Sequence, residues 1–416
     1  MTRQYKDSGI EWIGQIPMDW KMQPLAIYFA ENSKSNSDLG SVNALQFKYG
    51  EIIQKPNNGK ELTDKDRELL EKYTVVSPDD IVVNGLNLNY DLKSLRIAKV
   101  REEGIITSAY IVLRPRNGAN ASFYNYYLKA LDFQKIFHGM GVGIRLTLSY
   151  DELRSMLLAV PSFEEQQRIA DYLDKKCAEI DGLIELQELM IAQLTDYKQS
   201  VITEAVTKGI NPDAQLVPSG IDWIGDVPAD WKVCKLKNAY KLLNGRAYLD
   251  PELLEDGKYR ILRVGNLFSS DKWYYSDMEL EENKYCDSGD LLYGWSASIG
   301  PYIWTEERVI YHYHIWKVLF GKNDLHYSYY LLQALTLAKQ RDMHGSAMQH
   351  LTKINMDNSK IVIPPLSEQQ AIAAYLDSKC SEIDNLITAK QQKIETLNEY
   401  KKSIIFECVT GKKEIN

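Results

Sequence analysis

Cysteine is scarce in this sequence, and it occurs in no pattern that suggests a function. Five cysteines are found among 416 residues, and no two of them form a C-x-x-C pair. Neither a zinc site nor a disulfide framework is therefore indicated. No run of 18 apolar residues exists, so no membrane-spanning helix is predicted. The N-terminal residues also lack the apolar core of a secretory signal, and we expect the protein to work in a reducing cytoplasm.

The chain as a whole carries no excess of positive charge. Its 49 Lys and Arg are outnumbered by 57 Asp and Glu, which gives a formal net charge of −8 at pH 7. Residues 161–208 hold 5 Lys and Arg against 10 Asp and Glu, whereas residues 1–160 hold 20 against 19. Any nucleic-acid binding must therefore come from local patches or from a basic partner.

The most informative feature is a predicted helix that occurs twice. One copy runs from about residue 164 to 208, and the other runs from about residue 367 to the C-terminus. The two align without a gap at an offset of 203 residues. The motif E-Q-Q-x-I-A-x-Y-L-D, for example, occupies both 165–174 and 368–377. A constant offset over a whole helix indicates a duplicated unit.

Mainly apolar residues step alternately by four and three along both helices, which is the heptad pattern of a helix that pairs with another. A helix of this length spans roughly 65 Å, too long for the core of one domain. We therefore predict two struts that pair through an apolar seam. The predicted seam residues are Ile169, Leu173, Ile180, Leu183, Leu194, Ile372, Leu376, Ile383, Leu386 and Leu397.

A second repeat lies ahead of each helix. The motif G-I-[E/D]-W-I-G-x-[I/V]-P-x-D-W occupies residues 9–20 and 220–231. Two Trp, one Pro and two Gly in twelve residues are incompatible with a regular helix. We call this segment the clasp and predict an anchored loop whose indoles pack on a sheet or on the helices.

The segments between clasp and helix, residues 21–160 and 232–363, are called the first and the second globe. Both have strand-like runs, among them 81–83 in the first globe and 291–293 in the second, and residues 311–319 alternate as a single strand should. Aromatic-rich helices are predicted at 123–137 and 327–343. Aligning these helices pairs Tyr126-Tyr127-Leu128 with Tyr329-Tyr330-Leu331, whereas the loops 84–104 and 294–308 share almost nothing.

The order clasp, globe, helix, clasp, globe, helix has a geometric consequence. The first helix carries the chain away from the first globe, so the second helix must run back along it. We predict an α+β fold with two pseudo-two-fold-related α/β globes separated by a long antiparallel two-helix coiled coil. Two globes at a fixed separation suit two half-sites on a DNA duplex, which lie about one helical turn, roughly 34 Å, or a multiple of it apart.

The paired clasps, the paired E-Q-Q-x-I-A-x-Y-L-D helices and the two divergent globes together resemble the specificity subunit of type I restriction–modification systems. The resemblance covers the whole chain. It implies an N-terminal target-recognition domain at 1–160, a central conserved helix at 161–210, a C-terminal target-recognition domain at 211–363 and a C-terminal conserved helix at 364–416.

The resemblance also implies partners. Two DNA-adenine methyltransferase subunits and motor-nuclease subunits would bind this chain and double-stranded DNA in a prokaryotic cytoplasm. S-adenosylmethionine, ATP and magnesium would sit on those partners, so this chain would bind no cofactor and hold no catalytic residue. In agreement, no G-x-x-x-x-G-K-[S/T] phosphate loop occurs. The segment Asn211-Pro212-Asp213 lacks the second proline and the aromatic residue of a methyltransferase loop.

DNA-contact candidates come from loops that differ between the globes. Residues 93–116 carry six Lys and Arg against two Glu, which suits phosphates. Asn amides can pair with adenine, and Arg can read guanine. The first-globe candidates are Asn84, Asn87, Asn89, Lys93, Arg96 and Arg145, and the second-globe candidates are Arg263, Asn266, Trp295, Ser296, Ser298, Gln349 and His350.

The sequence also suggests three alternative interpretations. Asp79, Asp91 and Lys93 resemble the PD-(D/E)xK arrangement of a stand-alone magnesium-dependent nuclease. A turn entering a strand is the better interpretation of Pro78-Asp79-Asp80, because Ser288-Gly289-Asp290 does the same in the second globe, which has no counterpart to Asp91 or Lys93. His312, His314 and His326 could ligate zinc, although alternating His among aromatic residues favours a sheet surface or core. A coiled-coil scaffold without a DNA role is the third alternative, but a scaffold does not need two divergent sets of loops.

Overall fold

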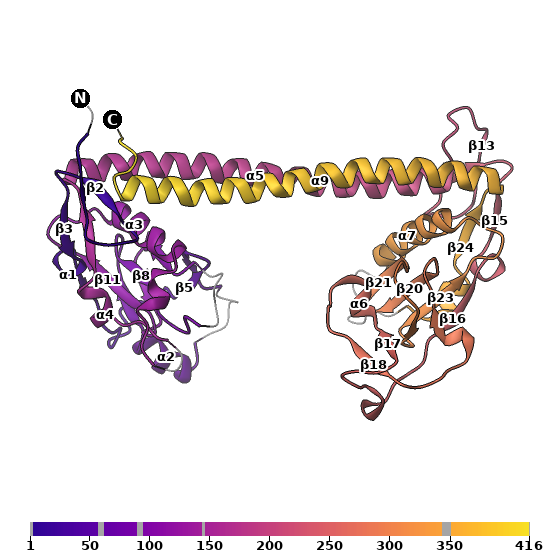
Figure 1. Ribbon diagram of the computed structural model, residues 1–416, viewed down its shortest axis with the longest axis horizontal. Coiled ribbons are helices and arrows are strands. Elements are labelled where there is room, and N and C mark those ends of the chain that lie inside the picture. Colours follow the sequence, from indigo (N-terminus) through magenta and orange to yellow (C-terminus); the bar gives the residue numbers. More distant parts are fainter. Residues whose placement is uncertain (1–2, 57–61, 90–94, 144–145, 343–350, 416) are drawn as a thin grey trace. The chain divides into compact units, whose positions relative to one another are not determined.

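The computed structural model describes residues 3–56, 62–89, 95–143, 146–342 and 351–415. The chain divides into two compact units (Figure 1). The first unit consists of residues 1–187 and 392–416, and the second consists of residues 188–391. Lys93, Arg145, Gln349 and His350 lie outside the described residues.

Both predicted long helices are present. They are α5 (Phe163–Lys208) and α9 (Leu366–Val409). Each is followed by a glycine in the left-handed conformation, Gly209 with φ of +78° and Gly411 with φ of +73°, which is the usual way to end a helix. The prediction that the second helix continues to the C-terminus was therefore wrong by a few residues.

In the first unit, the start of α5 packs against the end of α9. Lys401 of α9 forms an ion pair with Asp181 of α5 at 2.6 Å, and the Lys413 ammonium lies 5.5 Å from the centre of the Tyr172 ring. Tyr172, early in α5, contacts Lys413, whereas the later Asp181 contacts the earlier Lys401. The two segments therefore run in opposite directions in this unit.

The second unit contains the equivalent contact between the end of α5 and the start of α9. Lys198 forms an ion pair with Asp384 at 2.6 Å, and Lys390 Nζ lies 3.1 Å from Met190 Sδ. Asp384 is the repeat equivalent of Asp181, 203 residues later, and Lys198 is the repeat equivalent of Lys401, 203 residues earlier. Each unit therefore contains the same antiparallel contact, built from repeat-equivalent residues.

Burial along the predicted seam is uneven. The residues near the globes are buried, and Leu183 and Leu386, nearer the middle of each helix, are 47% and 48% exposed. Leu194 is half-buried. The buried seam residues are Ile169, Leu173, Ile180, Ile372, Leu376, Ile383 and Leu397.

A four-stranded antiparallel sheet with the same strand order forms the centre of each globe. In both, a helix packs on the last strand of the sheet and lies between the sheet and the long helices (Figure 1). The first sheet has the order β4 (Phe29–Glu31), β11 (Ile111–Pro115), β8 (Ile81–Val83), β9 (Ile97–Lys99), with α3 (Ala121–Phe133). The second has the order β16 (Lys241–Asn244), β23 (Ile315–Leu319), β20 (Leu291–Ser296), β21 (Ser298–Ile303), with α7 (Leu325–Asp342).

Two further antiparallel ribbons in each unit attach the globe to the clasp. In each unit one hairpin contains the clasp, and one ribbon joins the residues after the clasp to the strand that leads into the long helix. In the first unit β1 (Tyr5–Asp7) pairs with β2 (Gln15–Pro17) and β3 (Lys21–Pro24) with β12 (Leu157–Val160). In the second unit β13 (Leu216–Pro218) pairs with β14 (Asp226–Pro228) and β15 (Lys232–Lys235) with β24 (Lys360–Ile363).

The clasp is anchored as predicted. Trp20 has no exposed surface and belongs to one apolar core that also includes Ile169 of α5 and Val409 of α9. A Cβ placed on Gly411 would lie 2.4 Å from Pro17 and 3.2 Å from the Trp20 indole. In the second unit, a Cβ on Gly209 would lie 3.1 Å from Trp231. Each clasp therefore packs against the end of one long helix close to the start of the other.

The globes differ in their second layer of strands. The first has two separate ribbons, β5 (Leu45–Lys48) with β6 (Glu51–Gln54), and β7 (Thr74–Val76) with β10 (Gly104–Ile106). The second has one sheet in the order β18 (Tyr274–Ser276), β17 (Tyr259–Leu262), β22 (Val309–Tyr311), β19 (Tyr285–Cys286), in which β17 and β22 are parallel.

The single strand predicted over 311–319 was wrong. Strand β22 ends at Tyr311 and β23 begins at Ile315, and the two belong to different sheets. The amide of Ile315 donates to the His312 carbonyl at 2.9 Å, which closes a turn between them. Alternation continues through the turn, so the pattern alone could not reveal it.

The alignment of α3 with α7 was also wrong, by one residue. Gln166 Oε1 accepts from the amide of Asn120, and the equivalent Gln369 Oε1 accepts from the amide of Asp324, which sets the offset of these helices at 204. The remaining short helices are α1 (Leu25–Tyr28), α2 (Asp64–Glu71), η1 (Ile136–Gly139), α4 (Tyr150–Arg154), η2 (Leu236–Asn238), η3 (Asp250–Glu252), α6 (Val264–Phe268), η4 (Glu282–Lys284) and α8 (Lys353–Asp357).

Candidate nucleic-acid interface

In the first globe, the candidate loop at residues 84–89 follows β8 and is held by the backbone of residues 146–148. The amide of Leu88 donates to the Leu146 carbonyl, and the amide of Leu148 donates to the Gly85 carbonyl at 2.9 Å. A Cβ on Gly85 would lie 2.5 Å from the Leu148 carbonyl oxygen. Glycine is therefore required here by the close approach of two loops.

Arg96 holds this loop from inside the globe. Its side chain is buried, with 1% of the residue exposed. Its guanidinium Nη1 donates to the carbonyls of Asn84 at 3.0 Å and Leu86 at 2.8 Å. The prediction that Arg96 contacts DNA is contradicted by this burial, because its charge serves to satisfy loop carbonyls.

The asparagines of the loop differ in exposure. Asn84 is half-buried, and its side-chain oxygen accepts from the amide of Leu86 at 3.2 Å. Asn87 is exposed and has a positive φ of 50°, and Asn89 is also exposed. The tip of the loop therefore presents Asn87 and Asn89 to solvent.

Several of the cations in residues 93–116 are bound within the globe. Arg114 forms an ion pair with the buried carboxylate of Asp80 at 2.7 Å, and Lys99 pairs with Asp79 at 3.4 Å. Arg116 donates to the Ala26 carbonyl. Asp79 and Asp80 form the turn before β8, as the turn interpretation predicted. The other two members of the suggested nuclease triad, Asp91 and Lys93, lie outside the described residues.

In the second globe, several of the candidates surround one cavity of about 310 Å³. Residues around α6 form one wall, the turn between β20 and β21 forms another, and the corner between β22 and β23 closes the third. Its described lining includes no Asp or Glu and consists of Arg263, Val264, Gly265, Asn266, Ser270, Lys272, Tyr274, Ser296, Ala297, His312 and His314.

The cavity is electropositive at its mouth. Arg263 and Lys272 are exposed, and their cationic groups lie 5.3 Å and 5.0 Å from the centre of the Tyr274 ring. A hydrogen bond from Lys272 and the two positive charges lower the pKa of the Tyr274 hydroxyl. Two cations beside an aromatic ring form a surface that suits phosphate and base contacts.

Other predicted residues build the walls of the cavity. Asn266 donates to the carbonyls of Ser270 at 3.2 Å and Lys272 at 2.9 Å and accepts from the amide of Arg263 at 3.0 Å. Its amide thus shapes the loop, which argues against the predicted role in base pairing. Ser296 lines the cavity and is 5% exposed, whereas Ser298 is half-buried and is not among the lining residues.

Trp295 is half-buried and shapes the same region from β20. Its indole N–H donates to the Tyr313 carbonyl at 2.9 Å, and its ring stacks on Trp316 with centroids 5.7 Å apart. These contacts hold the corner between β22 and β23 against the central sheet.

Sequence reasoning missed the role of His312 and His314 in this cavity. The pKa of His312 is lowered to about 4, mainly by burial and to a smaller extent by the neighbouring His314 and Arg263. Its imidazole is therefore neutral near pH 7. His326 lies elsewhere, against Asp377 at 2.9 Å. No cluster of three His, Cys, Asp or Glu that could hold a metal occurs among the described residues.

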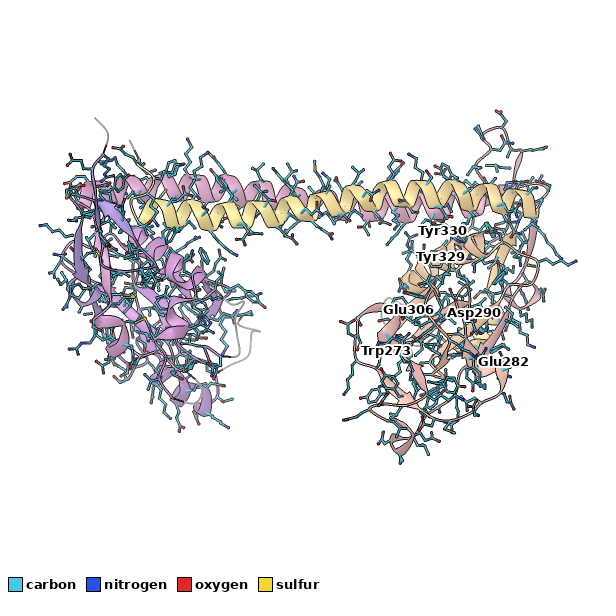
Figure 2. The ribbon with its side chains drawn as sticks, viewed as in Figure 1. Trp273, Glu282, Asp290, Glu306, Tyr329 and Tyr330 are labelled. Carbon is cyan, nitrogen blue, oxygen red and sulfur yellow. The ribbon has the colours of Figure 1, made fainter. Side chains whose placement is uncertain are left out.

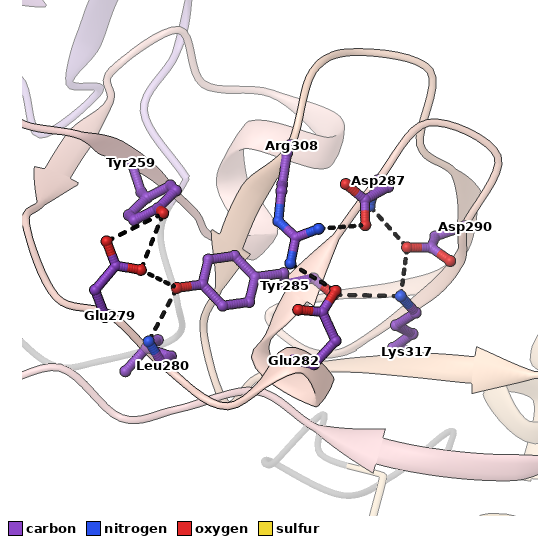
Figure 3. A network of polar contacts seen from close by, with 9 residues as sticks. All are labelled: Tyr259, Glu279, Leu280, Glu282, Tyr285, Asp287, Asp290, Arg308 and Lys317. Atoms are coloured by element: carbon purple, nitrogen blue, oxygen red, sulfur yellow. Dashed lines mark hydrogen bonds and ion pairs between the residues drawn. The ribbon is translucent and has the colours of Figure 1, made fainter.

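Another part of the second globe is acidic, and its cations are paired (Figure 3). Arg308 forms ion pairs with Glu282 at 2.6 Å and Asp287 at 3.4 Å, and Lys317 pairs with Asp290 at 2.5 Å. Because these cations are already matched by carboxylates, they offer a phosphate less than Arg263 and Lys272 do.

Comparison with known proteins identifies the family. The sequence profile of the type I restriction modification DNA specificity domain matches residues 45–190 and 228–398, which is most of the chain. The chain belongs to this specificity family. Members of this family recognise DNA, and the loops and the cavity are therefore interpreted with that function in view. None of the described helices has the length and hydropathy needed to cross a membrane.

Two relatives of this specificity protein come from Methanocaldococcus jannaschii. The present chain is 26% identical to the type I restriction enzyme MjaVIII specificity subunit over 82% of each chain. It is 24% identical to the putative MjaX specificity subunit over 96% of this chain and 95% of that protein. A solved chain from work on assembly and conformational transition of the type I R-M system shares the fold, with a TM-score of 0.72, 15% identity and coverage of 95% and 98%.

Proposed function

We propose that this chain is the DNA sequence-recognition subunit of a type I restriction–modification complex and binds a target made of two half-sites. One globe reads each half-site, and α5 and α9 form an antiparallel two-helix coiled coil that separates the globes. The observation that carries the proposal is the repeated contact of α5 with α9, Asp181–Lys401 in one unit and Lys198–Asp384 in the other.

Differences between the globes support a target with two unlike halves. The first globe presents Asn87 and Asn89 on a braced loop, and the second presents Arg263 and Lys272 at the mouth of a cavity. Amide side chains suit adenine, whereas cations suit phosphates or guanine. Of the other sequence candidates, Ser296 lines the cavity, Asn84 braces its own loop, and Trp295, Ser298, Lys93, Arg145 and Gln349 remain DNA-contact predictions.

We further propose which parts of this chain recognise DNA and which functions belong to partner subunits. The target-recognition domains are residues 1–160 and 211–363, and the conserved helices are residues 161–210 and 364–416. Two DNA-adenine methyltransferase subunits and motor-endonuclease subunits dock on the chain in the cytoplasm. Those partners bind S-adenosylmethionine, ATP and magnesium, and this chain contributes no catalytic residue.

Methylome sequencing tests the proposal. A strain that lacks this gene should lose one bipartite adenine-methylated motif, and a plasmid copy of the intact gene should restore it. The matched control is a copy that carries Arg308→Gln, which changes the acidic part of the second globe away from the cavity and should restore the same motif. An unchanged methylome in the deletion strain would refute the assignment.

A further inference from the structure

The duplicated helices retain polar residues for which an apolar seam has no need. The motif E-Q-Q-x-I-A-x-Y-L-D places Ile and Leu where a heptad requires them, but Glu165, Gln166 and Asp174 also recur as Glu368, Gln369 and Asp377. Gln166 and Gln369 are each only 3% exposed. Buried polar groups must find partners, and those partners show what the motif does.

The first position of the motif binds the clasp. The indole N–H of Trp20 donates to Glu165 Oε2 at 3.1 Å, and that of Trp231 donates to Glu368 Oε2 at 3.0 Å. In the first unit Arg3 adds an ion pair with Glu165 at 2.8 Å. Each clasp is thus bound to the first turn of the long helix that follows its globe.

The second position binds the first turn of the globe helix. Gln166 accepts from the amide of Asn120 at 3.3 Å and donates to the Pro161 carbonyl at 3.2 Å. Gln369 accepts from the amide of Asp324 at 2.8 Å and donates to the Pro364 carbonyl at 2.9 Å. In each unit, therefore, one buried glutamine side chain bonds both to a backbone amide at the N-terminus of α3 or α7 and to the carbonyl of a proline just before the long helix.

The last position of the motif, Asp174 or Asp377, binds further along the same globe helix. The Tyr126 hydroxyl donates to Asp174 at 2.7 Å, and the Tyr330 hydroxyl donates to Asp377 at 2.8 Å. Asp377 also contacts His326 Nδ1 at 2.9 Å. Asp174 lies eight residues beyond Gln166, roughly 12 Å further along the axis of α5 at 1.5 Å per residue.

We propose that these three residues of each motif are positioning residues, which set the rotation and height of each globe on its helix and thereby the number of base pairs between the half-sites. The proposal rests on the proposed function. Two anchors on one helix would leave a globe free to swing about the line between them. A third anchor away from that line removes this freedom. The bonds from Asn120 and Tyr126 of the globe, together with the bond from Trp20 of the adjoining clasp, therefore define one orientation.

The two globe tyrosines provide a mild test with a matched control. Tyr126→Phe and Tyr330→Phe each remove one hydroxyl and keep the ring. Tyr329→Phe is the control, because the Tyr329 hydroxyl accepts from Gln333 of the same helix at 2.7 Å. Figure 2 labels Tyr329 and Tyr330 on α7. The control thus loses a comparable bond that joins no globe to a long helix.

Methylome sequencing of strains that carry each variant gives the first measurement. We expect unchanged half-site bases in Tyr126→Phe, with at least a fivefold rise in methylation of sites whose gap differs by one base pair. Tyr330→Phe should show a smaller rise, because Asp377 keeps the contact with His326. Gap distributions equal to that of Tyr329→Phe would overturn the proposal, as would altered half-site bases.

A measurement on the purified full-length chain separates this proposal from the proposed function. Spin labels at the exposed Asp38 of the first globe and Glu185 of α5 report the orientation of the globe on its helix. Tyr126→Phe and the stronger Gln166→Met should broaden the distance distribution relative to the wild-type chain. Widths equal to that of the wild-type chain would sink the positioning role. If the deletion strain keeps its methylome, the proposed function fails, and these widths alone decide the proposal.

Discussion

The two globes share the surface that meets the long helices and differ away from it. Their central sheets have the same strand order, and their contacts with α5 and α9 use equivalent Trp, Gln, Tyr and acidic residues. The second layer is two ribbons in the first globe and one four-stranded sheet in the second. Packing and buried hydrogen bonds constrain the shared surface, whereas a surface that reads DNA must vary to change its target.

The turn before the central strand shows how different residues serve one role. Asp79 in the first globe and Gly289 in the second both have a positive φ, of 71° and 92°. The next residue is an aspartate in both, paired with Arg114 in the first globe and with Lys317 in the second. The position of the charge pair is kept although its cation changes, because a carboxylate at the edge of the core needs a partner.

The largest difference between the globes is expected at these charge pairs. Arg114→Leu leaves the Asp80 carboxylate, whose side chain is 2% exposed, without its cation, and should cost about 2–3 kcal/mol of unfolding free energy. Lys317→Leu should cost about 1 kcal/mol, because the Asp290 side chain is 24% exposed. Urea denaturation measures both. Equal losses would contradict the assigned difference in burial.

The glycines that end the long helices provide a second comparison. Both have a positive φ, so alanine strains either site by about 1 kcal/mol. At Gly411 the new Cβ would also lie 2.4 Å from Pro17, whereas at Gly209 the nearest atom is on Trp231 at 3.1 Å. Gly411→Ala should therefore cost about 2–3 kcal/mol and Gly209→Ala about 1–2 kcal/mol. Thermal unfolding that ranks them in the opposite order would argue against the packing of the first clasp on α9.

Affinity for DNA should separate the buried arginine of the first globe from the exposed arginine of the second. Arg263→Gln removes a cation at the mouth of the cavity, so binding by the assembled complex should weaken about five- to tenfold and the salt slope should fall by about 1. Arg96→Gln should instead lower the stability of the chain, since Arg96 holds carbonyls of its own loop. Binding titrations at several salt concentrations test this, and an unchanged slope in Arg263→Gln would remove that residue from the interface.

The smallest effect is expected from pH. His312 has a folded-state pKa of about 4, below its unfolded value of about 6.5, so the unfolded chain binds the proton more readily. Its contribution to stability is present above pH 6.5 and is lost as the pH falls from about 6.5 toward 4. Denaturation midpoints of wild type and His312→Gln should converge over this window. Parallel curves would show that His312 is not buried in its neutral form.

Some of the fold and of the site could be predicted from the sequence. Gapless repetition and heptad spacing located α5 and α9 because helix length and seam are local properties. Two tryptophans among glycines predicted an anchored clasp. Asn87, Asn89 and Arg263 were predicted to contact DNA; they are exposed in the structure, and their contacts with DNA remain predictions. Lys272 and the His312–His314 corner escaped prediction, although basic residues interleaved with aromatic ones over 263–274 were a usable signal.

The remaining errors have one physical origin. Arg96 belongs to a basic stretch of sequence, but the loop carbonyls of Asn84 and Leu86 bind its side chain inside the globe. Residues 311–319 alternate as one strand, but pairing with β17 on one side and β20 on the other divides them between two sheets. In each case the partner lies ten or more residues away in the sequence, outside the short window that a local pattern describes.

The sequence by itself determined the duplication, the two long helices and the presence of two unlike globes, because repeats and periodicity are visible without coordinates. Only the tertiary structure decided which cations remain at the surface and which polar residues hold the globes to the helices. Charge and hydrogen bonding depend on distance in space, and a residue's neighbours in space are set by how the whole chain packs.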